Sequence, residues 1–136
     1  MPSPEHIVRS ARPGRTVVGW RLDRGQRAEL LERLPPRYRN VVADHVTLAA
    51  RVADDTTLPD DVAAEVVGHI DDGRGVEALV VSIGGITDRP DGSTYHITWS
   101  LGPRRGAKES NDVLAARPWQ PLREPIALEL SPERWP

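Results

Sequence analysis

The sequence predicts a single α+β domain, and three observations lead to this class. The chain has 136 residues, of which 38% are hydrophobic and 28% charged, which suits one globular domain with its own core. Six runs of β-forming residues are typical of strands, and turn-rich segments join three of them into an antiparallel meander. Only two segments are predicted to be helical, one in each half of the chain.

The domain is expected to span residues 16–136 and to follow a flexible N-terminal arm. Residues 1–15 are rich in Pro, Arg and Ser, a composition typical of a loose segment. The first strand is predicted over residues 16–22, with the sequence Thr-Val-Val-Gly-Trp-Arg-Leu.

A helix is predicted over residues 24–34. Asp23 is a suitable N-cap, because its carboxylate can accept a hydrogen bond from a free backbone N–H of the first turn. Apolar residues recur at helical spacing within the segment, namely Ala28, Leu31 and Leu34. Pro35 and Pro36 then end the helix, since proline cannot continue its hydrogen bonding.

Strands and turns alternate through the rest of the chain. Turns rich in Asp, Gly and Pro occupy residues 71–75 and 87–92. The remaining strands are predicted over residues 40–52, 62–70, 76–83, 93–101 and 125–130. A short helix is predicted over residues 110–116 and ends before Pro118.

Two of the predicted strands carry the same motif, a His and a Thr two residues apart. His45 and Thr47 share one face of their strand, because side chains alternate between faces. His96 and Thr98 share a face in the same way, each pair being about 7 Å apart. The motifs are 51 residues apart and predict two similar lobes that meet at a cleft. Alternatively, both His are half-buried strand residues whose nitrogens bond neighbouring carbonyls.

The aromatic residues beside the second motif are expected to serve packing. Tyr95 and Trp99 alternate with His96 and Thr98, so they point to the opposite face of the strand. We therefore expect them in the core and not against a nucleobase.

Two facing imidazoles suit cleavage of a phosphodiester by general acid–base catalysis. One takes a proton from water and the other gives one to the departing oxygen, and the pKa of His suits both tasks. Thr47 and Thr98 would donate hydrogen bonds to the non-bridging phosphate oxygens. Our first choice is His96 as base and His45 as acid, with the reverse assignment left open. No metal or cofactor is expected, since the chain has no Cys and two His make a poor zinc site.

The charge of the chain is unevenly distributed. Residues 1–51 hold ten basic and five acidic residues, whereas residues 54–77 hold eight acidic residues and one Arg. With a net charge of −2, the chain is not a uniformly basic nucleic-acid-binding protein, so a polyanion would be bound locally. A basic cluster follows the second motif and supplies candidates for substrate binding, namely Arg104, Arg105 and Lys108. The alternative is a solvated charged face.

Composition also predicts where the protein works. No apolar run approaches the length of a membrane span, and the first residues lack the apolar core of a signal peptide. The absence of Cys excludes a disulfide framework. We expect a cytoplasmic protein with no membrane partner; the sequence does not predict its oligomeric state.

The paired motifs resemble those of the two-histidine (2H) phosphoesterases. The second half of the chain is similar to the cyclic phosphodiesterase domain of fungal tRNA ligases. In that domain a His-x-Thr strand is followed by a Lys-x-x-Glu-Ser-Asn-like segment that opens a helix. Here Lys108, Ser110 and Asn111 match that segment, which makes Ser110 and Asn111 further candidates for substrate binding. The resemblance implies a bilobal fold in which two antiparallel sheets face a central cleft and helices lie outside.

The resemblance also implies an activity and a partner. It suggests metal-independent hydrolysis of a 2′,3′-cyclic phosphate at an RNA end, giving a 2′-phosphate and a free 3′-hydroxyl, in RNA repair or processing. Two alternatives remain open. One is a phosphodiesterase for a small cyclic or 2′,5′-linked nucleotide, and the other is a non-catalytic nucleotide-binding module that has kept the cleft.

Overall fold

Eight strands and three helices occur in residues 3–136, which are the residues that the computed structural model describes. The helices are α1 (Pro4–Ser10), α2 (Arg24–Arg33) and α3 (Glu109–Ala116). The strands are β1 (Pro13–Leu22), β2 (Asn40–Val41), β3 (His45–Val52), β4 (Ala64–Asp71), β5 (Val76–Ile83), β6 (His96–Leu101), β7 (Gln120–Leu128) and β8 (Leu130–Trp135). The predicted α+β class is therefore confirmed. None of the helices in this described part has the length and apolar character needed to cross a bilayer.

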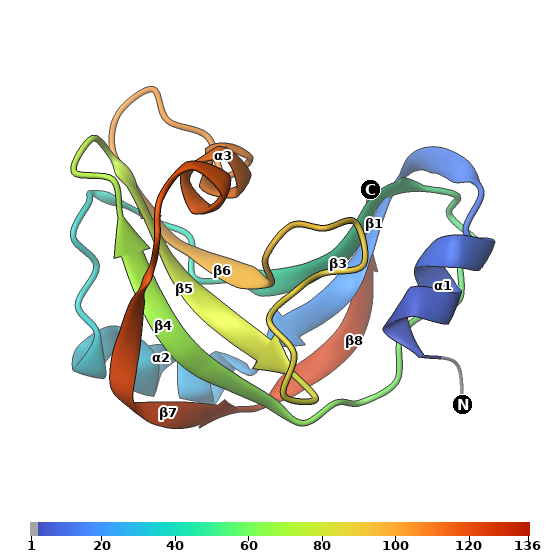
Figure 1. The fold of residues 1–136 in the computed structure, drawn as a ribbon, viewed down its shortest axis with the longest axis horizontal. Helices are drawn as coiled ribbons and strands as arrows, with labels where there is room; N and C mark the ends of the chain where they lie inside the picture. The colour runs from blue at the N-terminus through green and yellow to red at the C-terminus, as the bar shows by residue number, and fades with distance from the viewer. Residues whose placement is uncertain (1–2) are drawn as a thin grey trace.

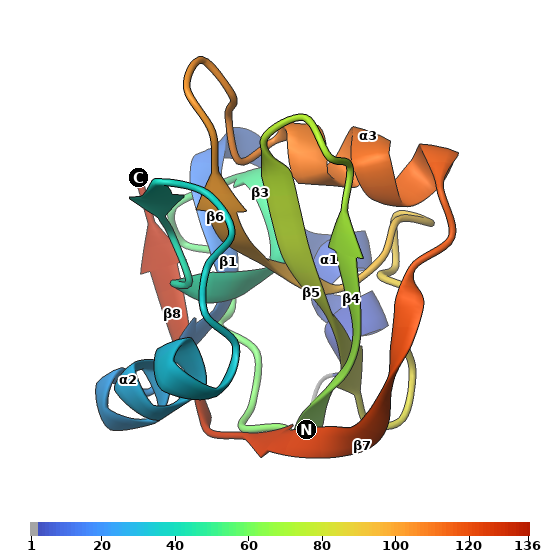
Figure 2. The same ribbon diagram turned by 90° about the vertical axis from the view of Figure 1, so that its left-hand side faces the viewer.

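The strands form two antiparallel sheets. One has three strands in the order β3-β1-β8, and the other has five in the order β2-β6-β5-β4-β7. The expected meander of β4, β5 and β6 is the centre of the larger sheet. Figure 1 shows the two sheets diverging from each other, with α3 above the larger sheet. Figure 2 shows α2 at the opposite end of the molecule from α3, and the long strand β7 running from beside α3 to that end.

The main hydrophobic core lies between the two sheets. It contains Trp20, Val46 and Leu48 from the smaller sheet and Ile97 and Trp99 from the larger one, all almost fully buried. Tyr95 is also buried, so the expectation that the aromatic residues beside the second motif pack in the core is confirmed. Side chains of this size contribute about 1.5–3 kcal/mol each when buried. The alternate side chains of the same strands consequently face away from this core.

The strand predicted over residues 40–52 is broken in the middle. Its first two residues form β2 in the larger sheet, and the rest forms β3 in the smaller one. Ala43 lies between them with φ of 44°, in the left-handed region, which turns the chain from one sheet to the other. Nothing in the sequence signals this break, because a residue other than Gly, Asn or Asp rarely adopts this conformation.

The N-terminal segment differs from the flexible arm predicted over residues 1–15. Residues 1–2 lie outside the described residues, but residues 4–10 form α1, whose first turn is capped by the Ser3 side chain. Ile7 is 1% exposed and belongs to the main core. Two adjacent apolar residues, Ile7 and Val8, within a short polar segment were too weak a pattern to predict this anchoring.

The C-terminal segment holds two strands where one was predicted over residues 125–130. β7 lies at an edge of the larger sheet, and β8 lies at an edge of the smaller sheet against β1. These strands contain Pro121, Pro125 and Pro132, and proline is tolerated in edge strands because one side of the strand has no partner.

Close contact between β1 and β3 predicts a strong effect of a methyl group at Gly19. A Cβ there would lie 2.2 Å from the Val46 carbonyl oxygen, which belongs to the backbone of β3 and cannot move aside easily. We expect Gly19→Ala to lower the free energy of unfolding by about 1–3 kcal/mol or more, measured by urea denaturation. Gly25→Ala is the matched control, because a Cβ there would meet only the flexible Asp23 side chain at 3.3 Å. An equal effect of the two substitutions would contradict the tight strand contact.

Candidate active site

Both His-x-Thr motifs line a single cleft of about 230 Å³. His45 and Thr47 enter it from β3, and His96 and Thr98 enter it from β6. Each motif lies on the face of its strand opposite the main core, as alternation predicted.

The imidazole of His45 is held on two sides. Its Nδ1 lies 3.0 Å from Asp44 Oδ2, and since a carboxylate only accepts, Nδ1 carries the proton of this hydrogen bond. The Trp135 ring lies against the imidazole at a centroid distance of 4.5 Å. Burial acts to raise the pKa of the Asp44 carboxyl, but the bond from His45 and the nearby Arg21 outweigh it and hold that pKa below its ordinary value. His45 Nε2 is therefore available to a ligand bound in the cleft.

His96 is oriented by the backbone. Its Nδ1 lies 2.8 Å from the Thr94 carbonyl oxygen, an acceptor, so Nδ1 again carries the proton and Nε2 has the lone pair. Burial, together with the positive charge of Arg89 and of His45, lowers the pKa of His96 below 6.5. His96 is therefore neutral at pH 7, with a free basic nitrogen. The bond to a carbonyl matches the alternative expectation for a structural His, but it engages only one of the two ring nitrogens.

The hydroxyl of Thr98 belongs to a buried pair. Its Oγ1 lies 2.9 Å from Ser110 Oγ, in the first turn of α3, and 3.4 Å from the Ala107 carbonyl oxygen. Ser110 is fully buried and is not the N-cap of α3, a position that Lys108 occupies. The segment that resembles the tRNA ligase domain therefore packs directly against the second motif.

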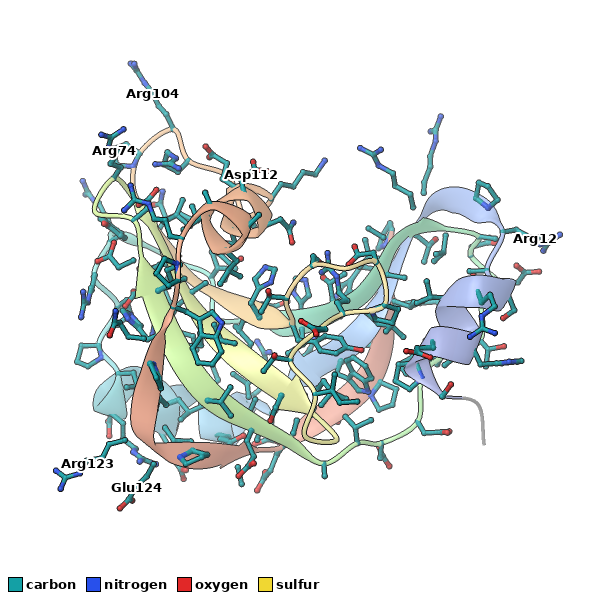
Figure 3. The ribbon with its side chains drawn as sticks, viewed as in Figure 1. Arg12, Arg74, Arg104, Asp112, Arg123 and Glu124 are labelled. Atoms are coloured by element: carbon teal, nitrogen blue, oxygen red, sulfur yellow. The ribbon has the colours of Figure 1, made fainter. Side chains whose placement is uncertain are left out.

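The structure brings only some of the candidate substrate-binding residues to the cleft. Lys108 and Asn111 line it. Arg105 instead pairs with Asp72 and Glu109, and Arg104 lies at the tip of the β6–α3 loop, where Figure 3 shows it pointing away from the molecule. Of the three basic candidates, Lys108 is therefore the one that the structure places at the cleft.

Two residues near the cleft were missed in the sequence. Arg89 lines the cleft from the β5–β6 loop, and Trp135 contacts His45 from the C-terminal strand. Arg89 stands in a segment whose Pro, Asp and Gly residues predicted only a turn. Neither has a local pattern that could have marked it, because both reach the motifs through the folding of distant segments.

The remaining histidines of the chain lie elsewhere. His69 is bonded through Nε2 to the buried carboxylate of Glu77 at 2.8 Å, and His6 is exposed on α1. A larger cavity of about 530 Å³ lies beside His69 and contains neither motif. Among residues 3–136 no group of three or more His, Asp or Glu lies together as a set of metal ligands.

Comparison of the chain with protein-family models, with curated proteins and with solved structures gives no match. The chemistry of the site therefore rests on its geometry. Two imidazoles with free Nε2 atoms, two hydroxyls, a guanidinium and an ammonium line one small cleft. This set can bind an anion and transfer protons on both sides of it.

The depressed pKa of His96 predicts a pH-dependent stability. The unfolded chain takes up a proton at His96 once the pH falls below about 6.5, whereas the folded protein resists it, so unfolding becomes easier as pH falls toward the folded pKa. We expect the His96 resonances in NMR to titrate below 6.5. We also expect the unfolding free energy of the wild type to fall more on acidification than that of His96→Gln. Equal slopes would show that the pKa of His96 is not lowered.

Proposed function

We propose that the protein is a two-histidine phosphoesterase that hydrolyses a 2′,3′-cyclic phosphate at an RNA end without a metal. The observation that carries the proposal is the convergence of both His-x-Thr pairs on one cleft, each with Nε2 unengaged. The two sheets, each bearing one motif, agree with the bilobal fold that the sequence resemblance implies. The proposed products are a 2′-phosphate and a free 3′-hydroxyl, formed in RNA repair or processing in the cytoplasm.

The environments of the two His divide their roles. His96 is buried and neutral, so its Nε2 would accept a proton from the attacking water. His45 lies against Asp44, whose carboxylate would stabilise the imidazolium that donates a proton to the departing 3′ oxygen. In the reverse assignment the neutral, buried His would have to begin the reaction charged, which the neighbouring guanidinium of Arg89 opposes.

The threonines would bind the phosphoryl oxygens. The single proton of Thr98 Oγ1 is directed to the Ala107 carbonyl oxygen at 3.4 Å in this structure and would turn to a non-bridging oxygen of the substrate, while Ser110, 2.9 Å away, donates to Thr98 Oγ1. Ser110 would thereby orient the hydroxyl without touching the substrate. Thr47 lines the opposite side of the cleft and would act in the same way. Such donors act most strongly on the charge that develops in the transition state.

The size of the cleft supports recognition of a terminal nucleotide. Its volume of about 230 Å³ lies below the range of roughly 300–1,000 Å³ typical of small-molecule pockets. A cleft of this size suits one terminal nucleotide group such as a ribose cyclic phosphate, whereas a folded or double-stranded RNA would remain outside it. The same observation favours a second candidate, a phosphodiesterase for a small cyclic or 2′,5′-linked nucleotide.

The first test is hydrolysis of an RNA oligonucleotide that ends in a 2′,3′-cyclic phosphate. We expect turnover to a 2′-phosphate by the wild type and a loss of about 100-fold or more for His45→Ala and His96→Ala. His6→Ala is the matched control and should retain full activity, because His6 is exposed on α1. A 3′-phosphate product would be consistent with the same mechanism but would show that the bond to the 2′ oxygen is cleaved. Turnover confined to short nucleotides would favour the second candidate, and binding without turnover of any of them would favour a non-catalytic module.

The mechanism also predicts a bell-shaped dependence of kcat/KM on pH. Activity requires one neutral and one protonated imidazole, so it should be lost both when the two imidazoles carry a proton and when neither does. The acidic limb should lie below pH 6.5, the ordinary value from which the pKa of His96 is lowered. EDTA should leave the rate unchanged. A rate that rises steadily to high pH would contradict the two-histidine mechanism.

A further inference from the structure

Arg89 combines burial with a fixed position at the wall of the cleft. Its residue is 9% exposed, and it is bonded through Nε and Nη2 to the two carboxylate oxygens of Asp91, at 3.2 and 3.1 Å. Nη2 also donates to Asn111 Oδ1 at 3.3 Å, which joins the loop to α3. The loop itself is closed by a bond from the Arg89 N–H to the Ser93 carbonyl. The guanidinium is therefore held on one edge before any ligand binds.

The other edge of the guanidinium is free. Within residues 3–136 no group accepts a hydrogen bond from Nη1, and Nη1 is not among the buried polar atoms that lack a partner. Arg89 lines the same cleft as His45 and His96. An arginine that uses Nε and Nη2 to bind a carboxylate and keeps Nη1 available beside a cavity is suited to binding a second oxyanion.

We propose that Arg89 is a phosphate-binding residue, whose Nη1 donates to a non-bridging oxygen of the substrate phosphate between the two His. The inference rests on the proposed function and names a contact that neither motif supplies. The transition state and the 2′-phosphate product carry more negative charge than the cyclic diester. A fixed guanidinium therefore binds the transition state more strongly than the substrate, which raises kcat.

A purely structural role for Arg89 predicts different results. In that case the residue serves only to tie Asp91 and Asn111 together, and its removal would loosen the β5–β6 loop without affecting anion affinity in a protein that remains folded. The two roles are separated by Arg89→Lys, which keeps the charge but loses the fork, and by Arg89→Gln, which loses the charge. Arg123→Gln is the matched control for loss of one positive charge, because Arg123 lies on β7, at the far end of the molecule from α3 (Figure 3).

The experiment has two readouts, measured on the full chain of each variant after its folding has been checked by circular dichroism. The first is turnover of the cyclic-phosphate RNA. The second is binding of inorganic phosphate, followed by NMR of the His resonances and by calorimetry. We expect Arg89→Gln to lower kcat by roughly 100-fold or more, with Arg89→Lys intermediate and Arg123→Gln unchanged. Phosphate affinity should fall in the same order.

The titration of His96 gives a further readout that does not depend on activity. His96 is faced by Arg89 and Asp91 from the loop and by His45 from β3, and Lys108 of α3 lines the same cleft. Loss of the Arg89 charge should raise the pH midpoint of the His96 titration, whereas Arg123→Gln should leave that midpoint unchanged. An unmoved midpoint in folded Arg89→Gln would place the guanidinium away from the His and overturn the proposal.

The outcomes separate this inference from the proposed function. Unchanged turnover and unchanged phosphate affinity in folded Arg89→Gln would overturn the role of Arg89 and leave the hydrolase intact. If the wild type hydrolyses no cyclic phosphate, the proposed function fails; phosphate binding lost only in the Arg89 variants would still support the anion site. Should Arg89→Gln fail to fold, Arg89→Lys and Asp91→Asn carry the test, since each disturbs the fork while keeping the positive charge.

Discussion

The spacing of the two His depends on the point where the chain crosses between the sheets. Val42 and Ala43 donate their N–H groups to the carbonyls of β6, while the Asp44 carbonyl accepts from Leu22 on β1. Ala43, which has a left-handed backbone conformation, donates to the Thr98 carbonyl of the second motif. His45 of the first motif follows only two residues later. The two motifs are thereby linked through backbone bonds and not only through side-chain packing. A cleft built this way cannot widen unless these bonds break.

Helix α2 contributes to the site by holding this crossing. Arg27 donates to the carbonyls of Val42 and Ala43, and Arg24 donates to the carbonyl of Asp44. The Val42 and Ala43 carbonyls would otherwise be poorly satisfied where the chain leaves one sheet and has not yet joined the other, whereas the Asp44 carbonyl also accepts from Leu22. Part of the positive charge in the first third of the chain, which suggested contact with a polyanion, therefore serves to satisfy the backbone behind the site.

The sequence predicted which face of each strand packs in the core better than it predicted where the strands begin and end. Alternation alone was enough to place His96 and Thr98 in the cleft and Trp99 in the core, because a buried strand face leaves no other register. The break at Ala43 was not predictable, since the crossing is stabilised by distant partners and no glycine marks it. Arg89 was missed for a related reason: its role depends on a loop folding back over the sheet, which turn residues permit but do not specify.

Charge in the cleft bears on how the two imidazoles would act in the proposed reaction. Arg89 and Lys108 bring positive charge to the walls, and the nearby carboxylates are already engaged, Asp91 with Arg89 and Asp44 with His45. Without a ligand, burial disfavours protonation of His96, and so does the positive charge of Arg89. A bound phosphate offsets it, so by linkage the anion raises the proton affinity of His96 by as much as protonation raises affinity for the anion. In the proposed reaction His96 becomes a stronger base only when there is a substrate to attack, and its basicity rises further as negative charge builds on the phosphoryl oxygens.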